Sequence, residues 1–208
     1  MKLISVNIGL PREVTWKGKT ITTGIFKEPV SERVMVQSLN LKGDRQADLI
    51  VHGGLDKAVY VYPFEHYDAW RSELPHPKLP LGIFGENFTT TGLKETEVNI
   101  GDRFRIGDVH LMVTQPRLPC YKLGIRFGRP DMVKQFLASR RTGFYFRVLQ
   151  EGEVGAGDTL ELVSQDNNNI TVADITQLYV REEDDPELLH RAAQLEALPK
   201  SWRDYFQR

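Results

Sequence analysis

Short β-forming runs divided by turn residues are the feature that most restricts the fold of this 208-residue chain. Glycine and aspartate favour tight turns, and Gly-Asp pairs recur at residues 43–44, 101–102, 107–108 and 157–158. The third pair separates the runs 104–106 and 109–111, which predicts a β-hairpin. Further strand-like runs are residues 20–26, 49–51 and 58–62. Many short strands with frequent turns predict a mainly β fold, a barrel or a sandwich.

Five helices are expected beside these strands. Residues 64–74 and 130–140 have helical spacing of their apolar side chains, and the second opens with a proline at its first turn. The composition changes at the polar segment 165–169, and three further helices are expected between residues 170 and 208. Three helices in so few residues form a weak core alone, so we expect them to pack on the β domain or on a partner. The predicted domains are residues 1–165 and 170–208.

Charge and composition exclude several classes of function. The formal net charge is −1, so no overall basic field is present and direct nucleic-acid binding is not expected. A single cysteine excludes an internal disulfide and suits a reducing compartment. No apolar run approaches the roughly 20 residues that span a bilayer, and residues 1–8 are typical of a strand rather than a signal peptide. We therefore expect a cytoplasmic protein without a membrane partner.

The only cysteine, Cys120, lies in a segment of unusual composition. Pro116 and Pro119 restrict the backbone before it, so the segment is expected to leave its strand and form a stiff loop. Arg117 and Lys122 flank the cysteine, and nearby cations favour the thiolate that attacks electrophiles or binds metals. The alternative is a small buried apolar side chain, which is the commoner role of a lone cysteine.

Three other segments are candidates for a site. The Gly53-Gly54 turn with Lys57 could bring backbone amides and a cation to an anion, or it could be a plain hairpin turn. Glu86 and Asn87 are polar residues in an apolar stretch, so they need either protein partners or a ligand. Arg147 lies in an aromatic strand and could grip a phosphate or a carboxylate, or face water.

Other familiar sites are not indicated. The five histidines have no tight ligand spacing, so a zinc site is not expected. The Gly-x-Ser-x-Gly motif of serine hydrolases is absent. A cysteine–histidine nucleophile pair stays open, because its partners can be distant in sequence.

Taken in order, these segments resemble the MOSC family, named for the C-terminal domain of molybdenum-cofactor sulfurases. The resemblance covers about the first 165 residues, and the matching blocks are His52-Gly53-Gly54-x-Asp56-Lys57-Ala58-Val59, Phe84-Gly85-Glu86-Asn87-Phe88, Gln115-Pro116-Arg117-x-Pro119-Cys120-x-Lys122 and Arg147-Val148-x-x-x-Gly152. The remaining residues resemble the three-helix domain of stand-alone bacterial members of the YiiM type. The resemblance implies a closed β-barrel of the pyruvate-kinase-barrel type with this helical domain appended.

The resemblance also implies a molybdenum cofactor, molybdopterin. The cysteine that matches Cys120 supplies a thiolate to molybdenum in that family, and soft thiolate ligands suit such a metal. The pterin phosphate would be met by cations and amides, for which the candidates are Gly53, Gly54, Lys57, Arg117, Lys122 and Arg147.

The implied activity is the reduction of N-hydroxylated compounds, such as N-hydroxylated nucleobase analogues, to amines. Glu86, Asn87 or Asp56 would bind the substrate or move protons. Because no flavin or iron–sulfur motif is visible, a flavoprotein reductase would supply the electrons. The main alternative is a non-catalytic carrier of the cofactor or of a persulfide on Cys120, and a more distant one is a cysteine-nucleophile hydrolase. The helices could serve docking or formation of a homodimer.

Overall fold

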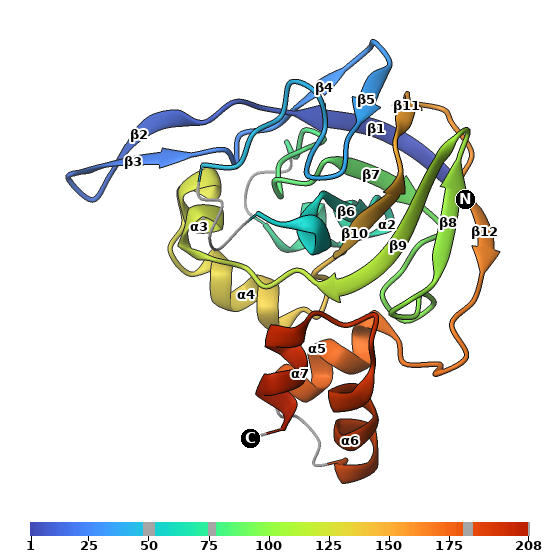
Figure 1. Cartoon of the computed structure of the whole chain (residues 1–208). Coiled ribbons are helices and arrows are strands. Elements are labelled where there is room, and N and C mark those ends of the chain that lie inside the picture. Colours follow the sequence, from blue (N-terminus) through green and yellow to red (C-terminus); the bar gives the residue numbers. More distant parts are fainter. Residues whose placement is uncertain (48–52, 75–77, 181–184, 208) are drawn as a thin grey trace.

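A curled β-sheet with helices at one end makes up the computed structural model, which describes residues 1–47, 53–74, 78–180 and 185–207 (Figure 1). The largest sheet has the strand order β12-β8-β9-β10-β6-β7-β1-β4, and of its pairs only β6–β7 is parallel. Its strands are β1 (Lys2–Ile8), β4 (Glu28–Val30), β6 (Val59–Pro63), β7 (Phe88–Thr91), β8 (Arg103–Ile106), β9 (Val109–Pro116), β10 (Phe144–Gln150) and β12 (Glu161–Ser164). Two small pairs are β2 (Arg12–Trp16) with β3 (Lys19–Thr23), and β5 (Val34–Val36) with β11 (Gly152–Val154).

Backbone hydrogen bonds close this sheet on itself. The amide of Leu3 in β1 donates to the carbonyl of Asp158 at 2.9 Å, and the amide of Gly157 donates to the carbonyl of Leu3 at 2.7 Å. The amide of Leu160 donates to the carbonyl of Met1 at 3.1 Å. Residues 157–160 lead directly into β12, which pairs with β8. The ring of strands is therefore complete, and the predicted mainly β, closed-barrel fold is confirmed.

Alternating burial along the strands separates the barrel interior from a second apolar layer outside it. In β10, Phe144, Phe146 and Val148 are buried in the main core, whereas the side chains between them belong to the other face. The second layer packs helices α2 (Glu65–Glu73) and α4 (Met132–Ala138) against the outer face of β6. Its largest fully buried side chains include Tyr62 and Trp70. These two layers cover the two sides of β6, with Val59 and Val61 in the first and Tyr60 and Tyr62 in the second.

Several local predictions are confirmed and others are wrong. The predicted hairpin at 107–108 is β8–β9, and the two predicted helices contain α2 and α4. The run 20–26 is a strand only to Thr23, where it ends the β2–β3 hairpin. The strand expected at 49–51, together with His52, lies outside the described residues.

The cysteine segment leaves its strand later than predicted. Strand β9 continues to Pro116, which pairs with Phe144 of the neighbouring strand. Residues 117–120 then form the loop, and helix α3 (Tyr121–Phe127) follows without an irregular stretch. Sequence analysis missed this helix because Gly124 weakens the helical pattern. A Cβ atom at this position would lie 2.9 Å from the carbonyl oxygen of Arg129, so the glycine permits a close backbone approach.

The three helices predicted after residue 170 are present as α5 (Val172–Val180), α6 (Pro186–Gln194) and α7 (Lys200–Phe206). The predicted capping box forms, because the Thr171 amide donates to Asp174 Oδ2 at 2.8 Å and the Asp174 amide donates to Thr171 Oγ1 at 3.0 Å. The helices pack at one end of the barrel, beneath β9 and β10 (Figure 1), and their apolar side chains join the barrel core in one cluster. Within the described residues, none of the helices combines the length and apolarity that crossing a bilayer requires.

Candidate functional site

A cavity beside the cysteine loop brings the cysteine together with most of the predicted cations. Its empty volume, open mouth included, is about 660 Å³. Five of the predicted site residues line it, namely Lys57, Asn87, Arg117, Cys120 and Lys122. These residues come from three separate segments of the chain, so the fold assembles a site that no single motif contains.

Cys120 is held at the junction between the loop and helix α3. Its backbone is extended, with φ −121° and ψ 172°, and it occupies the position that precedes the first turn of α3. Its carbonyl accepts the amide of Leu123 at 2.9 Å, and the side chain is half-buried. The loop therefore presents the sulfur to the cavity from a fixed backbone.

Arg117 is a buried cation with an unsatisfied hydrogen-bonding group. Its guanidinium carbon lies 5.3 Å from the ring centre of Tyr60 and 5.0 Å from that of Phe136. The residue is 6% exposed, and its Nη1 atom is buried without a hydrogen-bond partner among the described residues. A buried donor on a charged group is unfavourable unless something accepts from it. An anion in the cavity would satisfy this atom.

Tyr145 lies beside Arg117 and Cys120 on the cavity wall. Burial raises the pKa of the Tyr145 hydroxyl, while a hydrogen bond with Arg117 and the charge of that guanidinium act in the opposite direction. Tyr145 pairs with Tyr60 of the neighbouring strand, so two aromatic side chains form one wall. Both residues were missed by sequence analysis, although alternation of tyrosine with valine at residues 59–62 indicates a strand with two packed faces.

The described lining of the cavity is strongly positive. It contains no carboxylate, and its cations are Lys27, Arg45, Lys57, Arg117 and Lys122. Lys27 and Arg45 carried no signal in the sequence analysis. Lys27 forms a buried ion pair with Asp44, and burial lowers the pKa of Lys27 although Asp44 acts in the opposite direction. Burial also lowers the pKa of Lys57, against the effect of Asp56. Such a lining suits a phosphate or another anion.

Asn87 lines the cavity, but its polar atoms are used within the protein. Its Oδ1 atom accepts the amide of Tyr60 at 3.1 Å. Its Nδ2 atom donates to Asp44 Oδ2 at 2.9 Å and to the carbonyl of Asn7 at 3.3 Å. Asn87 thus holds Asp44, which in turn pairs with Lys27 of the cavity.

Glu86, the other predicted polar residue of this segment, is fully buried and does not line the cavity. Its Oε1 atom accepts the amide of Gly82 and the hydroxyl of Thr89, both at 2.9 Å, and the hydroxyl of Tyr67. Its Oε2 atom accepts the amide of Phe84 at 3.1 Å. Burial raises the pKa of Glu86, while these hydrogen bonds oppose the rise. The carboxylate fixes the turn that supports one cavity wall.

Arg147 and the glycine pair lie away from the cavity lining. The Arg147 Nε atom donates to Asp56 Oδ1 at 2.8 Å, so both of these predicted residues are engaged with each other. Gly54 has a φ of 103° and precedes the short helix η1 (Leu55–Lys57). Its carbonyl accepts a hydrogen bond from the Lys57 amide at 3.0 Å. The turn therefore contributes to the site through Lys57, which it directs into the cavity.

Comparisons with known proteins agree with this architecture. The MOSC domain family matches residues 48–161, and the YiiM-like, 3-alpha helix domain matches residues 170–208. YflK of Bacillus subtilis (strain 168) is 44% identical over 204 residues, which are 98% of this chain and 92% of YflK. The crystal structure of YiiM from Geobacillus stearothermophilus has a TM-score of 0.82 at 35% identity and covers 99% of this chain and 97% of its own. A protein named "Reductase" from Gibberella moniliformis (strain M3125 / FGSC 7600) is 38% identical over 151 residues, which are 71% of this chain but 27% of that protein.

Proposed function

This chain belongs to the MOSC family and carries the YiiM-like three-helix domain, and from that membership we propose that it binds molybdenum cofactor and reduces N-hydroxylated compounds to amines. The observation that carries the proposal is the buried Nη1 atom of Arg117, which has no partner within the described part of the chain and lies on the wall of the cavity that contains Cys120. A guanidinium in this state has a free N–H donor, from which a phosphate oxygen can accept.

The residues of the cavity fit such a cofactor. The Cys120 sulfur is a soft ligand of the kind that molybdenum takes. Arg117, Lys57 and Lys122 would meet the phosphate and the negative charge of the metal centre. The rings of Tyr60 and Phe84 offer flat apolar walls to a pterin.

When bound, molybdenum cofactor supplies the two-electron chemistry that removes oxygen from an N-hydroxyl group. In the net reaction, the substrate takes up two electrons and two protons, the N–O bond breaks, and the products are an amine and water. Cys120 would hold the metal centre, and Arg117 would orient the cofactor. The Tyr145 hydroxyl lines the cavity and would donate a hydrogen bond to the substrate oxygen. Glu86 and Asn87 position the wall rather than contact the substrate.

The electrons would come from a separate flavoprotein reductase in the cytoplasm. The Gibberella protein is named a reductase, which supports reductive chemistry. Only 27% of its length corresponds to this chain. In that protein most of the sequence lies outside the shared part.

A second candidate function is a non-catalytic carrier of the cofactor. It is favoured by the described lining of the cavity, which contains no carboxylate for proton transfer, and by the complete hydrogen bonding of Asn87. A carrier would bind molybdenum through Cys120 but leave an N-hydroxylated substrate unchanged.

The test is metal and pterin analysis of the protein purified from molybdenum-sufficient cells. We expect close to one molybdenum per chain, and Cys120→Ser should lose the metal while its melting temperature and cooperativity are kept. The loaded protein should oxidise a reduced dye when an N-hydroxylated nucleobase is added. Metal-free wild-type protein, or Cys120→Ser protein that keeps its metal, would contradict the proposal. Metal-loaded protein without dye oxidation would favour the carrier.

A further inference from the structure

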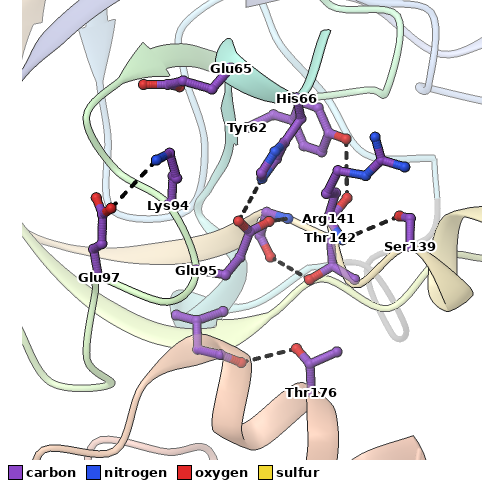
Figure 2. Close-up of polar contacts among 12 residues, drawn as sticks. Tyr62, Glu65, His66, Lys94, Glu95, Glu97, Ser139, Arg141, Thr142 and Thr176 are labelled. Carbon is purple, nitrogen blue, oxygen red and sulfur yellow. Dashed lines mark hydrogen bonds and ion pairs between the residues drawn. The ribbon is translucent and has the colours of Figure 1, made fainter. Parts of the chain in front are cut away.

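Behind the cavity wall, Glu95 and His66 form a pair that the proposed reaction does not use (Figure 2). His66 lies on α2, and its Nε2 atom is 2.6 Å from Glu95 Oε2. The other carboxylate oxygen, Oε1, accepts the amide of Gly143 at 2.6 Å. Glu95 is 4% exposed, so its carboxylate is buried with these two partners. Burying a carboxylate carries a large desolvation penalty, which makes its arrangement informative.

Gly143 connects this pair to the cavity through one peptide segment. Its amide donates to Glu95, while its carbonyl accepts the amide of Arg117 at 3.1 Å. Gly143 has a φ of +65°, and a Cβ atom there would lie 2.3 Å from the carbonyl oxygen of Val61. The backbone is therefore pressed against β6, and only a glycine fits. One residue separates the Glu95 carboxylate from the backbone of the cavity arginine.

The segment before Gly143 is also fixed from the cavity side. The Tyr60 hydroxyl donates to the carbonyl of Thr142 at 2.8 Å, and the Tyr62 hydroxyl donates to the carbonyl of Arg141 at 3.1 Å. Tyr60 is itself a cavity wall and lies beside the Arg117 guanidinium. Glu95 thus holds one end of a short segment, and the Tyr60 contact at Thr142 links that segment to the site. Figure 2 shows Tyr62, Arg141 and Thr142 of this region.

We propose that Glu95, oriented by His66, is a positioning residue that sets the place of the Arg117 guanidinium in the cavity through the peptide of Gly143. The inference rests on the proposed function only for the identity of the anion that Arg117 binds. On this proposal, loss of the Glu95 carboxylate displaces the Arg117 guanidinium and so weakens the positive field at Cys120, although the Glu95 side chain contacts neither Arg117 nor Cys120.

The test uses metal-free full-length protein and two alkylating reagents, neutral iodoacetamide and anionic iodoacetate. Both react with the Cys120 thiolate, so a general change in exposure or ionisation alters both rates together. A displaced guanidinium lowers only the relative rate of the anion, because a positive charge at the thiol concentrates anionic reagents. The ratio of the iodoacetate rate to the iodoacetamide rate therefore reports the position of Arg117, and Arg117→Met gives the value without this charge.

Glu95→Ala should lower this ratio about threefold to tenfold, towards the value of Arg117→Met. Glu95→Gln, which keeps an oxygen for the Gly143 amide, should restore most of the ratio. The matched control is Glu65→Ala, because Glu65 also accepts a glycine amide, that of Gly92 at 2.7 Å. Within the described structure, Gly92 makes no hydrogen bond to Arg117.

A Glu95→Ala protein that melts at a lower temperature but keeps the wild-type ratio would overturn the proposal and leave Glu95 a purely structural role. If Glu95→Ala does not fold, His66→Ala is measured instead, since it removes the imidazole that orients the carboxylate and leaves no donor in its place. An unchanged ratio in that variant would also overturn the proposal. Failure of the proposed function is distinguishable, because it appears as absence of molybdenum from wild-type protein and leaves the reagent ratio unaffected.

Discussion

Arg117 and Glu86 are both buried charged side chains, and they differ in how completely they are satisfied. Glu86 accepts four hydrogen bonds from its own protein, whereas Arg117 keeps a buried Nη1 atom without a partner in the described residues. A fold tolerates the second state where a ligand completes it. At the residue scale, the count of partners therefore separates a side chain that builds the wall from one that serves the cavity.

Replacing Glu86 by glutamine tests its structural role. Glutamine keeps the size of the side chain but puts an NH2 group among four donors, so at least one buried donor loses its acceptor. We expect the free energy of unfolding to fall by about 1–3 kcal/mol, measured by urea denaturation. Glu161→Gln is the control, because Glu161 is an exposed partner of Arg105, and it should change stability by less than about 0.5 kcal/mol. Equal effects of the two substitutions would refute the wall-building role of Glu86.

Residue types alone identified part of this site. The cysteine with its flanking cations indicated Arg117, Cys120 and Lys122, because thiol chemistry depends on nearby charge. Residue types could not indicate that the polar atoms of Asn87 are hydrogen-bonded within the protein, since its partners Asp44 and Asn7 are some 40 and 80 residues away in sequence. Hydrogen bonds at such separations depend on the closed barrel and leave no local pattern.

At the scale of elements, strand β9 leads into the cysteine loop of the site, and the C-terminal helices pack against this strand. The Trp202 Nε1 atom of α7 donates to Gln115 Oε1 at 2.6 Å in a buried contact. Gln115 lies two residues before Arg117 and five before Cys120, at the end of β9. The same helical domain contacts Glu95, because the amide of Ala173 donates to the Glu95 carbonyl at 3.0 Å. The helices thus brace the strand and the turn that lead to the site.

Trp202→Phe tests this support. Phenylalanine keeps a ring beside Tyr179 and Phe206, which Trp202 contacts at 5.4 and 5.8 Å between ring centres, but it cannot donate to Gln115. The Gln115 amide nitrogen is already buried without a partner within the described structure, so the whole amide would then be unsatisfied. We expect a loss of about 1–3 kcal/mol in the free energy of unfolding, measured by chemical denaturation.

The matched control is Trp16→Phe in the β2–β3 hairpin, which Figure 1 shows extending away from the barrel. Trp16 is half-buried there, and we expect a change within about 0.5 kcal/mol. A Trp202→Phe protein as stable as wild type would mean that the contact with Gln115 contributes little to the position of β9.

Helix and strand positions were predictable where the local pattern was strong. The capping box at Thr171 and the first turn at Asp185 and Pro186 indicated α5 and α6, and both helices begin there. Helix α3 was not predictable, because it begins two residues after Pro119 and contains Gly124, which allows close packing against Arg129. The extension of β9 to Pro116 was missed because a proline was expected to end the strand earlier. Proline is tolerated at the end of a strand, where no further backbone donor is needed.

At the scale of the whole molecule, the barrel and the helices share one apolar core. Side chains of α5 to α7, such as Leu178 and Phe206, belong to the same buried cluster as the barrel residues Phe104 and Phe146. A continuous core makes the two parts unfold together. The boundary near residue 165 therefore marks a change in sequence pattern from strands to helices, while the apolar core continues across it.

Calorimetry of the full chain should give a single transition. Leu178→Ala, in α5, should lower the stability of the whole transition by about 2–5 kcal/mol, because it opens a cavity in the shared core. The change should appear equally in the β-sheet and the helical components of the circular dichroism. Two resolved transitions, or a change confined to the helical signal, would show that the helices unfold independently.

The hydrogen bonds between β1 and residues 157–160 also have a consequence for synthesis on the ribosome. The first strand emerges more than 150 residues before the segment that completes its edge, an interval of roughly 10–30 s at 5–20 residues per second. During that time the nascent chain exposes an unpaired strand edge, which is a surface prone to aggregation. Closure of the barrel is thus among the last events of translation. A ribosome-bound chain that stops short of residue 157 cannot form the hydrogen bonds that close it.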